Sequence, residues 1–359
     1  MHRKLIAAFA LLIFAGPAVA EAASQESKAP KLSVMTRNVY LGADIARPIG
    51  SKTIEEFEQK NQIVWDTVVK TNFPARAKLL AKEIKDTRPD FIGLQEVALW
   101  RKGPKGNPAP ATDVAYDFLK SLQKEIKARG LSYRVGSIQQ EANVEGPTTS
   151  DGDVRLTMRD VILVKKRSGL TITGKKGANF KARITVPTAA GPVTVKRGWT
   201  YVNAKLDGVK FRFINTHLEA FLASTRLEQT KELVGNGGPT NTNLPVILVG
   251  DMNSDAKGDP DGEGDPAPYR TIVKAGFKDA WTYIKRGTTG FTCCLKRETA
   301  DDPAPWPGDH RIDHIFTKPR ITGVKAVKVG VDPKNRTKGT PRLWPSDHGG
   351  WVATFKLVK

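Results

Sequence analysis

The hydrophobic pattern of this chain consists mainly of short apolar runs, each followed at once by polar side chains. The clearest run is 246–249, which reads Val-Ile-Leu-Val and is bounded by Pro245 and Gly250. Four apolar residues are too few for an amphipathic helix, so this run predicts a strand buried on both faces. Asp251 and Asn253 follow it, and side chains two positions apart on an extended segment share one face. Asp and Asn are also ordinary turn residues, so this stretch alone fits both a functional site and a plain turn.

The same reasoning predicts a mixture of strands and helices over the rest of the chain. Apolar or alternating runs predict strands at 32–37, 91–94, 131–136, 160–165, 311–317 and 351–357, and a hairpin of 199–206 with 209–215 across Asp207-Gly208. Helical spacing predicts helices at 75–85 and near 269–275. A third helix is expected between an N-cap at Asp113 and a C-terminal Gly130, and a fourth is expected to begin at a capping box of Thr225 and Glu228. The polar segments 101–112 and 139–153 are expected to be loops. Strands alternate with helices but hairpins also occur, which indicates an α/β fold with mixed sheets.

Chemically active side chains recur where the predicted strands end. They are Asn38, Glu96, His217, the pair Asp251 and Asn253, and the pair Asp347 and His348. Each of them alone has an ordinary explanation as a cap, a turn residue or a solvated acid. Strand ends that meet at one edge of a sheet form a cleft, where functional side chains collect. The recurrence therefore favours one active site over a series of unrelated turns.

The first 20 residues have the pattern of a secretory signal peptide. Arg3 and Lys4 precede an apolar run at 5–16, and Ala18-Val19-Ala20 offers a small-residue cleavage site. A polar lead-in at 21–30 and a single domain over 31–359 are expected to follow. No later stretch approaches membrane-spanning length, so we expect an exported protein, secreted or periplasmic, that is a monomer.

The formal net charge of +20 is strongly basic, and removal of residues 1–20 would take away Arg3 and Lys4 and no acid, leaving +18. Such an excess favours an anionic partner, such as nucleic acid, acidic lipid headgroups or another anionic surface. Basic exported proteins also occur without a specific anionic ligand, so the charge alone does not identify the partner.

The only two cysteines, Cys293 and Cys294, are adjacent. Their Cα atoms are about 3.8 Å apart across a trans peptide, which is shorter than a relaxed disulfide prefers. A strained vicinal disulfide and two buried thiols both remain open. A zinc site is not expected, because no second Cys/His pair has the required spacing.

Six short motifs follow one another in a fixed order along the chain, and five of them contain the polar residues described above. They are Thr36-Arg37-Asn38, Leu94-Gln95-Glu96, Asn215-Thr216-His217-Leu218, Gly250-Asp251-Met252-Asn253, Arg311-Ile312-Asp313-His314-Ile315 and Ser346-Asp347-His348. Together they resemble the endonuclease/exonuclease/phosphatase superfamily of metal-dependent phosphoesterases, over about residues 31–358. The resemblance implies a four-layer α-β-β-α sandwich, with two mixed sheets face to face and helices outside.

The resemblance also implies a metal site. Glu96 resembles the principal metal-binding carboxylate, with Asn38 beside it, and Asp347 resembles a further carboxylate on the metal side. Hard divalent cations bind carboxylate and amide oxygens, and such a cation polarises a phosphoryl oxygen. The expected cofactor is Mg²⁺, with Mn²⁺ or Ca²⁺ as alternatives.

Five further residues are expected to carry the catalysis. Asp251 resembles the residue that orients or deprotonates the attacking water, and Asn253 the amide that holds water or phosphate. His348 resembles the family's active-site histidine, paired with Asp313, while His217 is similar to a histidine of deoxyribonucleases and sphingomyelinases. A histidine beside an aspartate keeps one tautomer and is stabilised as imidazolium.

Four other features have simpler interpretations. Arg159 fits either a phosphate contact or an ordinary surface pair, and His310 and His314 are expected to be structural. The acidic segment 259–265 is expected to be a solvated loop. Counted from its first residue, the twelfth position is Arg270 and not the glutamate of a calcium-binding loop.

The substrate is less well defined than the chemistry. Nucleic acid is the first hypothesis, a phospholipid such as sphingomyelin the second, and a non-catalytic binding module the third, although the intact motifs disfavour the last. Candidate contacts for a nucleic acid backbone are Arg101, Lys102, Lys105, Lys196, Arg197, Lys334, Arg336 and Lys338. A lipid substrate would need exposed apolar residues, for which Trp306 and Trp344 are candidates.

Overall fold

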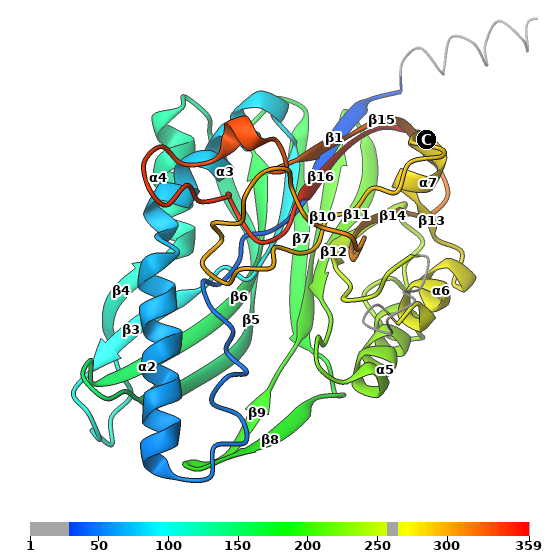
Figure 1. Ribbon diagram of the computed structural model, residues 1–359. Coiled ribbons are helices and arrows are strands. Elements are labelled where there is room, and N and C mark those ends of the chain that lie inside the picture. Colours follow the sequence, from blue (N-terminus) through cyan, green and yellow to red (C-terminus); the bar gives the residue numbers. More distant parts are fainter. Residues whose placement is uncertain (1–28, 257–264, 359) are drawn as a thin grey trace, which may run out of the picture.

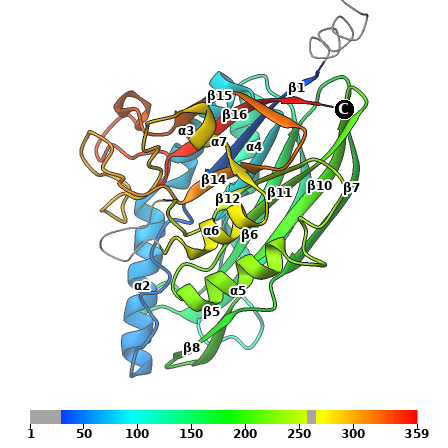
Figure 2. The same cartoon turned by 90° about the vertical axis from the view of Figure 1, so that its right-hand side faces the viewer.

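The computed structural model describes residues 29–256 and 265–358 (Figure 1). The expected signal peptide, most of the polar lead-in and most of the acidic segment lie outside these residues. Two large mixed sheets lie face to face, with helices on the two outer sides (Figures 1 and 2). The predicted four-layer α/β sandwich is therefore confirmed.

The first sheet has eight strands and is built around the parallel pair β1 (Lys31–Asn38) and β2 (Phe91–Gln95). Its other strands are β3 (Leu99–Gly103), β4 (Asp113–Asp117), β5 (Tyr133–Pro147), β6 (Asp153–Lys165), β15 (Ile321–Val329) and β16 (Gly350–Leu357). They run in the order β15-β16-β1-β2-β6-β3-β4, and β5 pairs with β6 outside this path. The outer helices on this side are α2 (Ile54–Lys70), α3 (Phe73–Thr87) and α4 (Phe118–Ala128) (Figure 1).

The second sheet has six strands in the order β13-β14-β12-β11-β10-β7. Their bounds are β7 (Leu170–Asn179), β10 (Gly198–Leu206), β11 (Val209–His217), β12 (Val246–Asp251), β13 (Lys278–Asp279) and β14 (Asp313–Thr317). On its outer side lie α5 (Ala223–Val234) and α6 (Ala267–Lys274), which face the viewer in Figure 2. The short helix α7 (Ala280–Ile284) packs at the edge of the sandwich, where the ring centroids of Trp281 and of Trp351 in the first sheet are 3.8 Å apart. A separate hairpin of β8 (Ile184–Thr188) and β9 (Gly191–Val195) and a 3₁₀ turn at Pro333–Asn335 complete the described elements.

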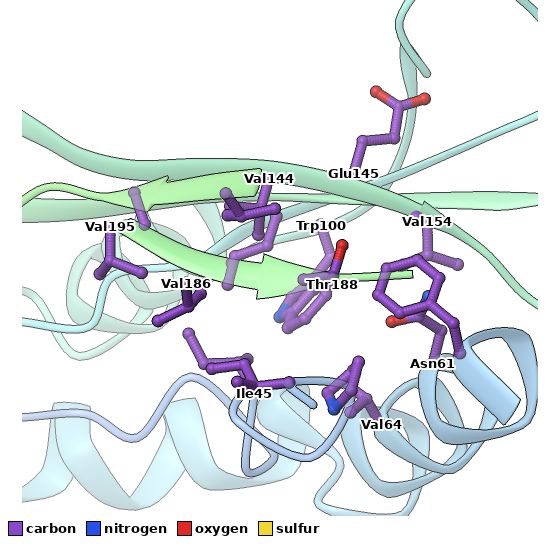
Figure 3. A pocket seen from close by; sticks show the side chains of 17 residues that line it. Ile45, Asn61, Val64, Trp100, Val144, Glu145, Val154, Val186, Thr188 and Val195 are labelled. Carbon is purple, nitrogen blue, oxygen red and sulfur yellow. The ribbon is translucent and has the colours of Figure 1, made fainter. Parts of the chain in front are cut away.

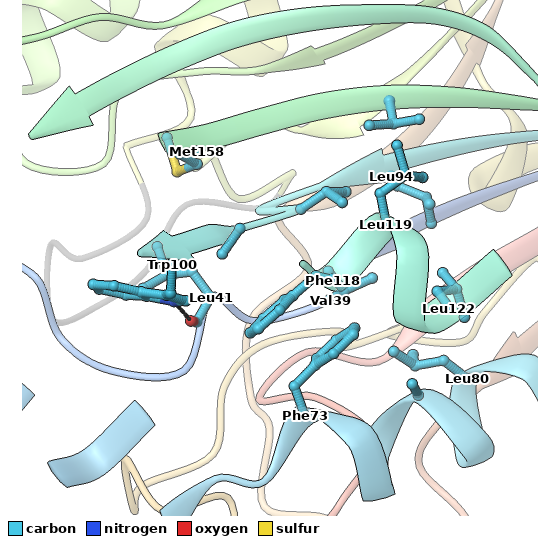
Figure 4. Packing of buried hydrophobic residues seen from close by; sticks show 14 of the residues in the cluster. Val39, Leu41, Phe73, Leu80, Leu94, Trp100, Phe118, Leu119, Leu122 and Met158 are labelled. Carbon is cyan, nitrogen blue, oxygen red and sulfur yellow. Dashed lines mark hydrogen bonds between the residues drawn. The ribbon is translucent and has the colours of Figure 1, made fainter. Parts of the chain in front are cut away.

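Aromatic side chains pack among aliphatic ones in the cores on both faces of the first sheet. Between the sheets, the ring of Phe91 contacts Phe211 and Phe213 at centroid distances of 5.4 and 5.2 Å. On the helix side, Phe73 of α3 stacks on Phe118 of α4, with 3.5 Å between the ring centroids (Figure 4). Burial of such rings is the main favourable term in the folding of both layers.

The two sheets approach each other closely near the ends of β2 and β11. Gly93 has no room for a side chain, because a Cβ there would lie 2.4 Å from Val249 and 2.6 Å from Asn215. Two residues later, the Gln95 amide donates to Asn215 Oδ1 at 2.6 Å, and Asn215 Nδ2 donates in turn to the Leu94 carbonyl at 2.9 Å. These contacts join the two sheets by hydrogen bonds between buried polar groups.

Several local expectations from the sequence are wrong. Most of segment 139–153 is not a loop, because β5 and β6 extend through it as a long antiparallel pair. Asp113 begins β4, and the cap of α4 is Asp117, whose carboxylate accepts from Leu119 N–H at 3.1 Å. Thr225 lies inside α5 and caps nothing. In each case pairing with a neighbouring strand or packing of the helix decides the boundary, and local residue preferences do not.

Asp279 lies in a buried network outside the strand-end cluster and should make stability depend on acid pH. Burial alone would raise its pKa, but hydrogen bonding and charge from His314 and Arg311 outweigh burial and lower the pKa to about 2. A depressed pKa means that the stabilisation is present above the unfolded value near 4 and is lost as the pH falls towards 2. We therefore expect Asp279→Asn to cost about 2 kcal/mol at pH 7, measured by urea unfolding.

The matched control is Asp86→Asn, which removes an exposed ion pair with Lys82 and should cost almost nothing. The difference between wild type and Asp279→Asn should shrink when the same unfolding curves are measured at pH 3. Equal unfolding midpoints at pH 7 would contradict the assigned role of this carboxylate.

Candidate active site

The strand register brings most of the predicted residues to one edge of the sandwich, and Asp347 and His348 reach this edge on the loop before β16. Asn38 ends β1 opposite Gln95, which directly precedes Glu96. In the other sheet His217 lies opposite Asp251 across the parallel pair of β11 and β12, and Asp251 lies opposite Asp313 across the antiparallel pair with β14. The structure therefore gathers residues from both sheets at the same edge.

A cleft of about 240 Å³ opens at this edge. Six of the predicted residues line it: Glu96, His217, Asp251, Asn253, Asp347 and His348. Asn38 and Asp313 lie behind them, fully buried. Arg159 is not part of the lining, and its guanidinium instead donates to Asp117 at 2.7 Å and to the carbonyls of Val97 and Ala98. This favours an ordinary ion pair over a phosphate contact.

Asn38 joins the two halves of the cleft floor. Its Nδ2 donates to Glu96 Oε1 and to Asp251 Oδ2, both at 3.0 Å. The second oxygen of Glu96 accepts from Leu41 N–H at 2.8 Å, and that loop is held in turn by a hydrogen bond from the Trp100 indole to the Leu41 carbonyl (Figure 4). Glu96 has a φ of +59°, in the left-handed region that a non-glycine residue rarely adopts. The Glu96 carboxylate is therefore held in one orientation.

Glu96 and Asp347 form an oxygen-rich group that fits a hard divalent cation. Burial, together with the negative charge of Glu96, raises the pKa of Asp347 to about 6. Two carboxylates that repel each other in a buried cleft are stabilised by a cation between them. Glu96 and Asp347 would hold such a cation, and the bound ion would neutralise charge on the phosphoryl group. Asn38 was also expected as a ligand, but its amide nitrogen donates to Glu96 and its oxygen accepts from Tyr40 N–H at 2.9 Å, so it orients Glu96 instead.

A second group, Asp251, Asp313 and His348, also has ligand atoms that all lie within 4.8 Å of one another. Here His348 Nδ1 is 2.8 Å from Asp313 Oδ2, so this nitrogen is already used in a hydrogen bond. Burial alone would lower the pKa of His348, but the charges of Asp313, Asp347 and Asp251 outweigh it and hold the pKa well above its usual range. The arrangement suits an imidazolium held by Asp313 better than a metal ligand.

Asp251 is placed to act on water. Burial, and then the nearby charge of Asp313, raises its pKa to about 7. Its Oδ1 accepts from Asn253 N–H at 3.0 Å, and Asn253 Nδ2 donates to the Leu218 carbonyl at 3.0 Å. A carboxylate whose pKa lies near neutrality is well matched to accepting a proton from a nucleophilic water.

Arg197 belongs to this site, although the sequence suggested only a basic surface loop for it. It is 4% exposed, lines the cleft, and has its Nη1 at 3.0 and 3.3 Å from the two ring nitrogens of His217. Burial, followed by the charge of Arg197, lowers the pKa of His217 well below its usual range. His217 is therefore neutral, and Arg197 supplies a buried positive charge beside it, with His217 Nε2 3.6 Å from Asp251 Oδ2.

Three buried carboxylates surround Arg197. Glu219 Oε2 lies 3.9 Å from its Nε, and the charge of Arg197 acts on both Glu141 and Asp160. Burial raises the pKa of Glu141 and of Asp160 well above the usual range. The three acids are far apart in the sequence, so no motif reveals this cluster. The sequence shows only that Arg197 lies just before a predicted strand.

The loop around the cysteines supports Asp347 and His348. Cys293 and Cys294 form a vicinal disulfide, which was one of the two alternatives left open by the sequence. Leu295 N–H donates to the Asp347 carbonyl at 3.0 Å, and Cys293 Sγ lies 3.7 Å from His348 Nε2. The loop thus fixes the backbone of the last motif.

A second pocket, of about 90 Å³, lies beside the cleft and is apolar (Figure 3). It shares Ile45 with the cleft, and side chains such as Val64, Trp100 and Val186 point into it (Figure 3). The Asn61 amide, on the pocket wall, donates to the Pro147 carbonyl. None of the predicted catalytic residues lines this pocket, so the chemistry is assigned to the cleft.

Comparison with known proteins agrees with this geometry. The model of the Endonuclease/Exonuclease/phosphatase family matches residues 69–348. Similar solved structures include a family member from Bacteroides thetaiotaomicron (16% identity, TM-score 0.57, covering 92% of this chain and 99% of that chain). A mannosyl-6-phosphatase from the same organism has 19% identity and a TM-score of 0.55, covering 90% of this chain and 99% of that chain.

TDP2 from D. rerio, in complex with a single-strand DNA product, has 19% identity and a TM-score of 0.53, covering 91% of this chain and 99% of that chain. No curated protein matches this chain. The likeness to these structures shows the shared fold, while the family match covers most of the chain. This protein belongs to the endonuclease/exonuclease/phosphatase family of metal-dependent phosphoester hydrolases.

Proposed function

We propose that this protein is an exported, Mg²⁺-dependent phosphodiester hydrolase whose substrate is nucleic acid. The observation that carries the proposal is the convergence of Asp251, whose pKa lies near 7, with the His348–Asp313 pair and the carboxylates of Glu96 and Asp347 in one cleft. This set can neutralise a phosphodiester and activate a water, which are the two requirements of the reaction.

The residues of the chain divide the work as follows. Asp251 accepts the proton of a water that attacks phosphorus in line. The bond to the leaving ester oxygen breaks, and this oxygen takes up a proton from solvent water. His348 remains protonated because Asp313 holds it, so it can donate a hydrogen bond to a phosphoryl oxygen. Arg197 adds a fixed positive charge beside neutral His217, which in turn lies 3.6 Å from Asp251. Bound Mg²⁺ would polarise the phosphoryl oxygen from the side of Glu96.

Nucleic acid is favoured over lipid by two observations. The chain carries a net charge of +20, and Lys296 and Arg297 line the cleft. Trp344, one of the two tryptophans considered for a lipid interface, is fully buried and packs on Trp306 with 5.3 Å between ring centroids. Several other basic candidates are already paired, for example Lys102 with Asp151 and Lys105 with Glu58. Backbone contacts are therefore expected mainly at the cleft.

A phospholipid substrate is the second candidate. It is favoured by Phe221 and Leu222, which are exposed beside the cleft and are the kind of side chain that enters a lipid interface. None of the described helices is long and apolar enough to cross a membrane. The proposal also includes export and a single domain over 31–359, and both rest on the sequence pattern. Export should remove residues 1–20, which the intact mass of the exported protein would test.

The test is a turnover panel with plasmid DNA, single-stranded DNA, RNA, sphingomyelin vesicles, bis(p-nitrophenyl) phosphate and mannose 6-phosphate. We expect hydrolysis of the nucleic acids and of bis(p-nitrophenyl) phosphate with Mg²⁺ and none with EDTA. At subsaturating substrate, DNA cleavage should fall steeply from low salt to about 0.2 M, whereas turnover of the small diester should barely change. Faster turnover of the monoester would identify a phosphatase, and sphingomyelin turnover far above that of DNA would reverse the choice of substrate.

A further inference from the structure

We propose that the cleft takes a single-stranded segment of nucleic acid, with an unpaired base stacked on Phe221 and a neighbouring phosphate held by Lys296 and Arg297. The inference rests on the proposed phosphodiester hydrolase function and specifies its substrate. Phe221, Lys296 and Arg297 all belong to the lining of the cleft.

Phe221 is exposed on a backbone that is firmly held. Its side chain and that of Leu222 are 51% and 48% exposed. The Phe221 N–H donates to Glu219 Oε1 at 2.8 Å, and Glu219 N–H donates to the Gln229 side chain at 2.8 Å. Arg226 donates to the carbonyls of Glu219 and Ala220, both at 2.9 Å. An aromatic ring that is half exposed on a fixed loop adds little to folding and is well placed for a ligand.

Lys296 and Arg297 are presented by another fixed loop. Their backbone N–H groups donate to the two oxygens of Asp302, at 3.0 and 2.8 Å, and Asp302 is 3% exposed. The Arg297 guanidinium is 3.9 Å from Asp301 in an exposed pair, which binds it only weakly. Both cationic side chains are therefore available to a phosphate.

The charges of the cleft explain why these residues matter. On the floor of the cleft, His348 and Arg197 face the carboxylates of Glu96, Asp251 and Asp347. Lys296 and Arg297 lie in the same lining, and their cations remain for a phosphate that flanks the one bound on the floor. A phosphate contact supplies affinity without sequence preference.

Stacking on Phe221 requires an open base face. In a duplex the faces of each base are covered by its neighbours, whereas a single strand can offer a base to a protein ring. Stacking also tolerates every base, so it gives a preference for strand state and not for sequence. A lipid interface is less favoured here, because the apolar pair is accompanied in the same cleft by charged residues such as Lys296 and Arg297.

The first experiment compares Phe221→Ala with wild type on a 12-nucleotide single strand, the same sequence as a duplex, and bis(p-nitrophenyl) phosphate. We expect KM for the single strand to rise about tenfold, within the range for loss of one base stack, with kcat nearly unchanged. The small diester should be hydrolysed as by wild type. Phe221→Trp should retain single-strand affinity, and Val324→Ala, an exposed apolar control on β15, should change nothing.

The second experiment tests the cations with Lys296→Ser/Arg297→Ser. If Lys296 and Arg297 neutralise two phosphates of a single strand, the affinity of wild type for that strand should fall about sevenfold between 50 and 200 mM salt. This salt dependence should be nearly abolished in the double variant, while hydrolysis of the small diester should persist. An unchanged salt dependence would remove these residues from the binding site.

Three outcomes would overturn the inference. An equal loss on the small diester would mean that Phe221 supports folding or catalysis, and thermal unfolding would separate these two. An equal loss on duplex and single strand would exclude base stacking. Loss of binding to sphingomyelin vesicles in Phe221→Ala, with DNA cleavage intact, would assign the ring to lipid. If wild type hydrolyses the small diester but no nucleic acid, this inference fails and the hydrolase function stands; if wild type hydrolyses no diester, the function itself fails.

Discussion

Glu96→Gln should lower kcat/KM with Mg²⁺ at least about a hundredfold, because it removes the negative charge of the main candidate metal ligand and keeps the shape of the side chain. The amide oxygen can keep the hydrogen bond from Asn38, whereas the amide nitrogen cannot accept from Leu41 N–H as Glu96 Oε2 does, so one hydrogen bond is lost. The side chain lines the cleft and not the core, so the fold should survive. Turnover measured against Mg²⁺ concentration, together with calorimetric binding of Mg²⁺, checks both consequences.

Glu298→Gln is the matched control, since Glu298 lines the same cleft but pairs with Arg47. It should keep near-normal metal affinity and turnover. If Glu96→Gln were folded and bound Mg²⁺ as tightly as wild type, the metal would have to sit elsewhere, and the Asp251, Asp313 and His348 group would be the next position to test.

His348→Ala should also lower kcat at least about a hundredfold, because the cleft then loses the imidazolium that contacts the phosphoryl group. Asp313→Asn should act through the same histidine, whose Nδ1 lies 2.8 Å from Asp313 Oδ2. The double variant should therefore be little slower than His348→Ala alone, since residues that act as a unit are not additive.

Imidazole added to the assay gives a readout that a purely structural role would not affect. It should restore part of the activity of His348→Ala and none of that of Glu96→Gln. Additive losses in the double variant, or weaker Mg²⁺ binding in Asp313→Asn, would argue that Asp313 is a metal ligand and not the partner of His348.

The sequence was most informative where chemistry and strand ends coincide. The apolar run 246–249 lies in β12, and the Asp207-Gly208 turn joins β10 to β11 as predicted. Because parallel and antiparallel neighbours align Asp251 with His217 and Asp313, recognising the strands was sufficient to place these side chains at one edge. Asn38, His217 and Asp251 end their strands as expected. Asp313 instead begins β14, and the last motif, Asp347-His348, precedes β16, so both ends of buried strands supply this edge.

Features that depend on long-range contacts could not be predicted in the same way. Arg197 follows the β8–β9 hairpin, and only the folded chain shows that its guanidinium reaches His217 instead of solvent. The second half of β5, from Gln139 onward, is mainly polar. Its residues form a strand because they pair with β6, which the local sequence does not indicate. Helix α2 was also missed, although Thr53 and Glu56 form the kind of cap that marks a helix start.

The contact between the sheets near Gly93 has a consequence for how the enzyme responds to change far from its cleft. Asn38 belongs to one sheet and Asp251 to the other, and a 3.0 Å hydrogen bond joins them directly beyond the Gln95–Asn215 contact. Sliding one sheet over the other by about an ångström would break this bond and separate the carboxylate that accepts the proton from the group that binds the metal. Turnover thus reports on the alignment of the two halves of the molecule. Substitutions in the layer between the sheets, such as at Phe91 or Phe213, can impair catalysis without touching substrate.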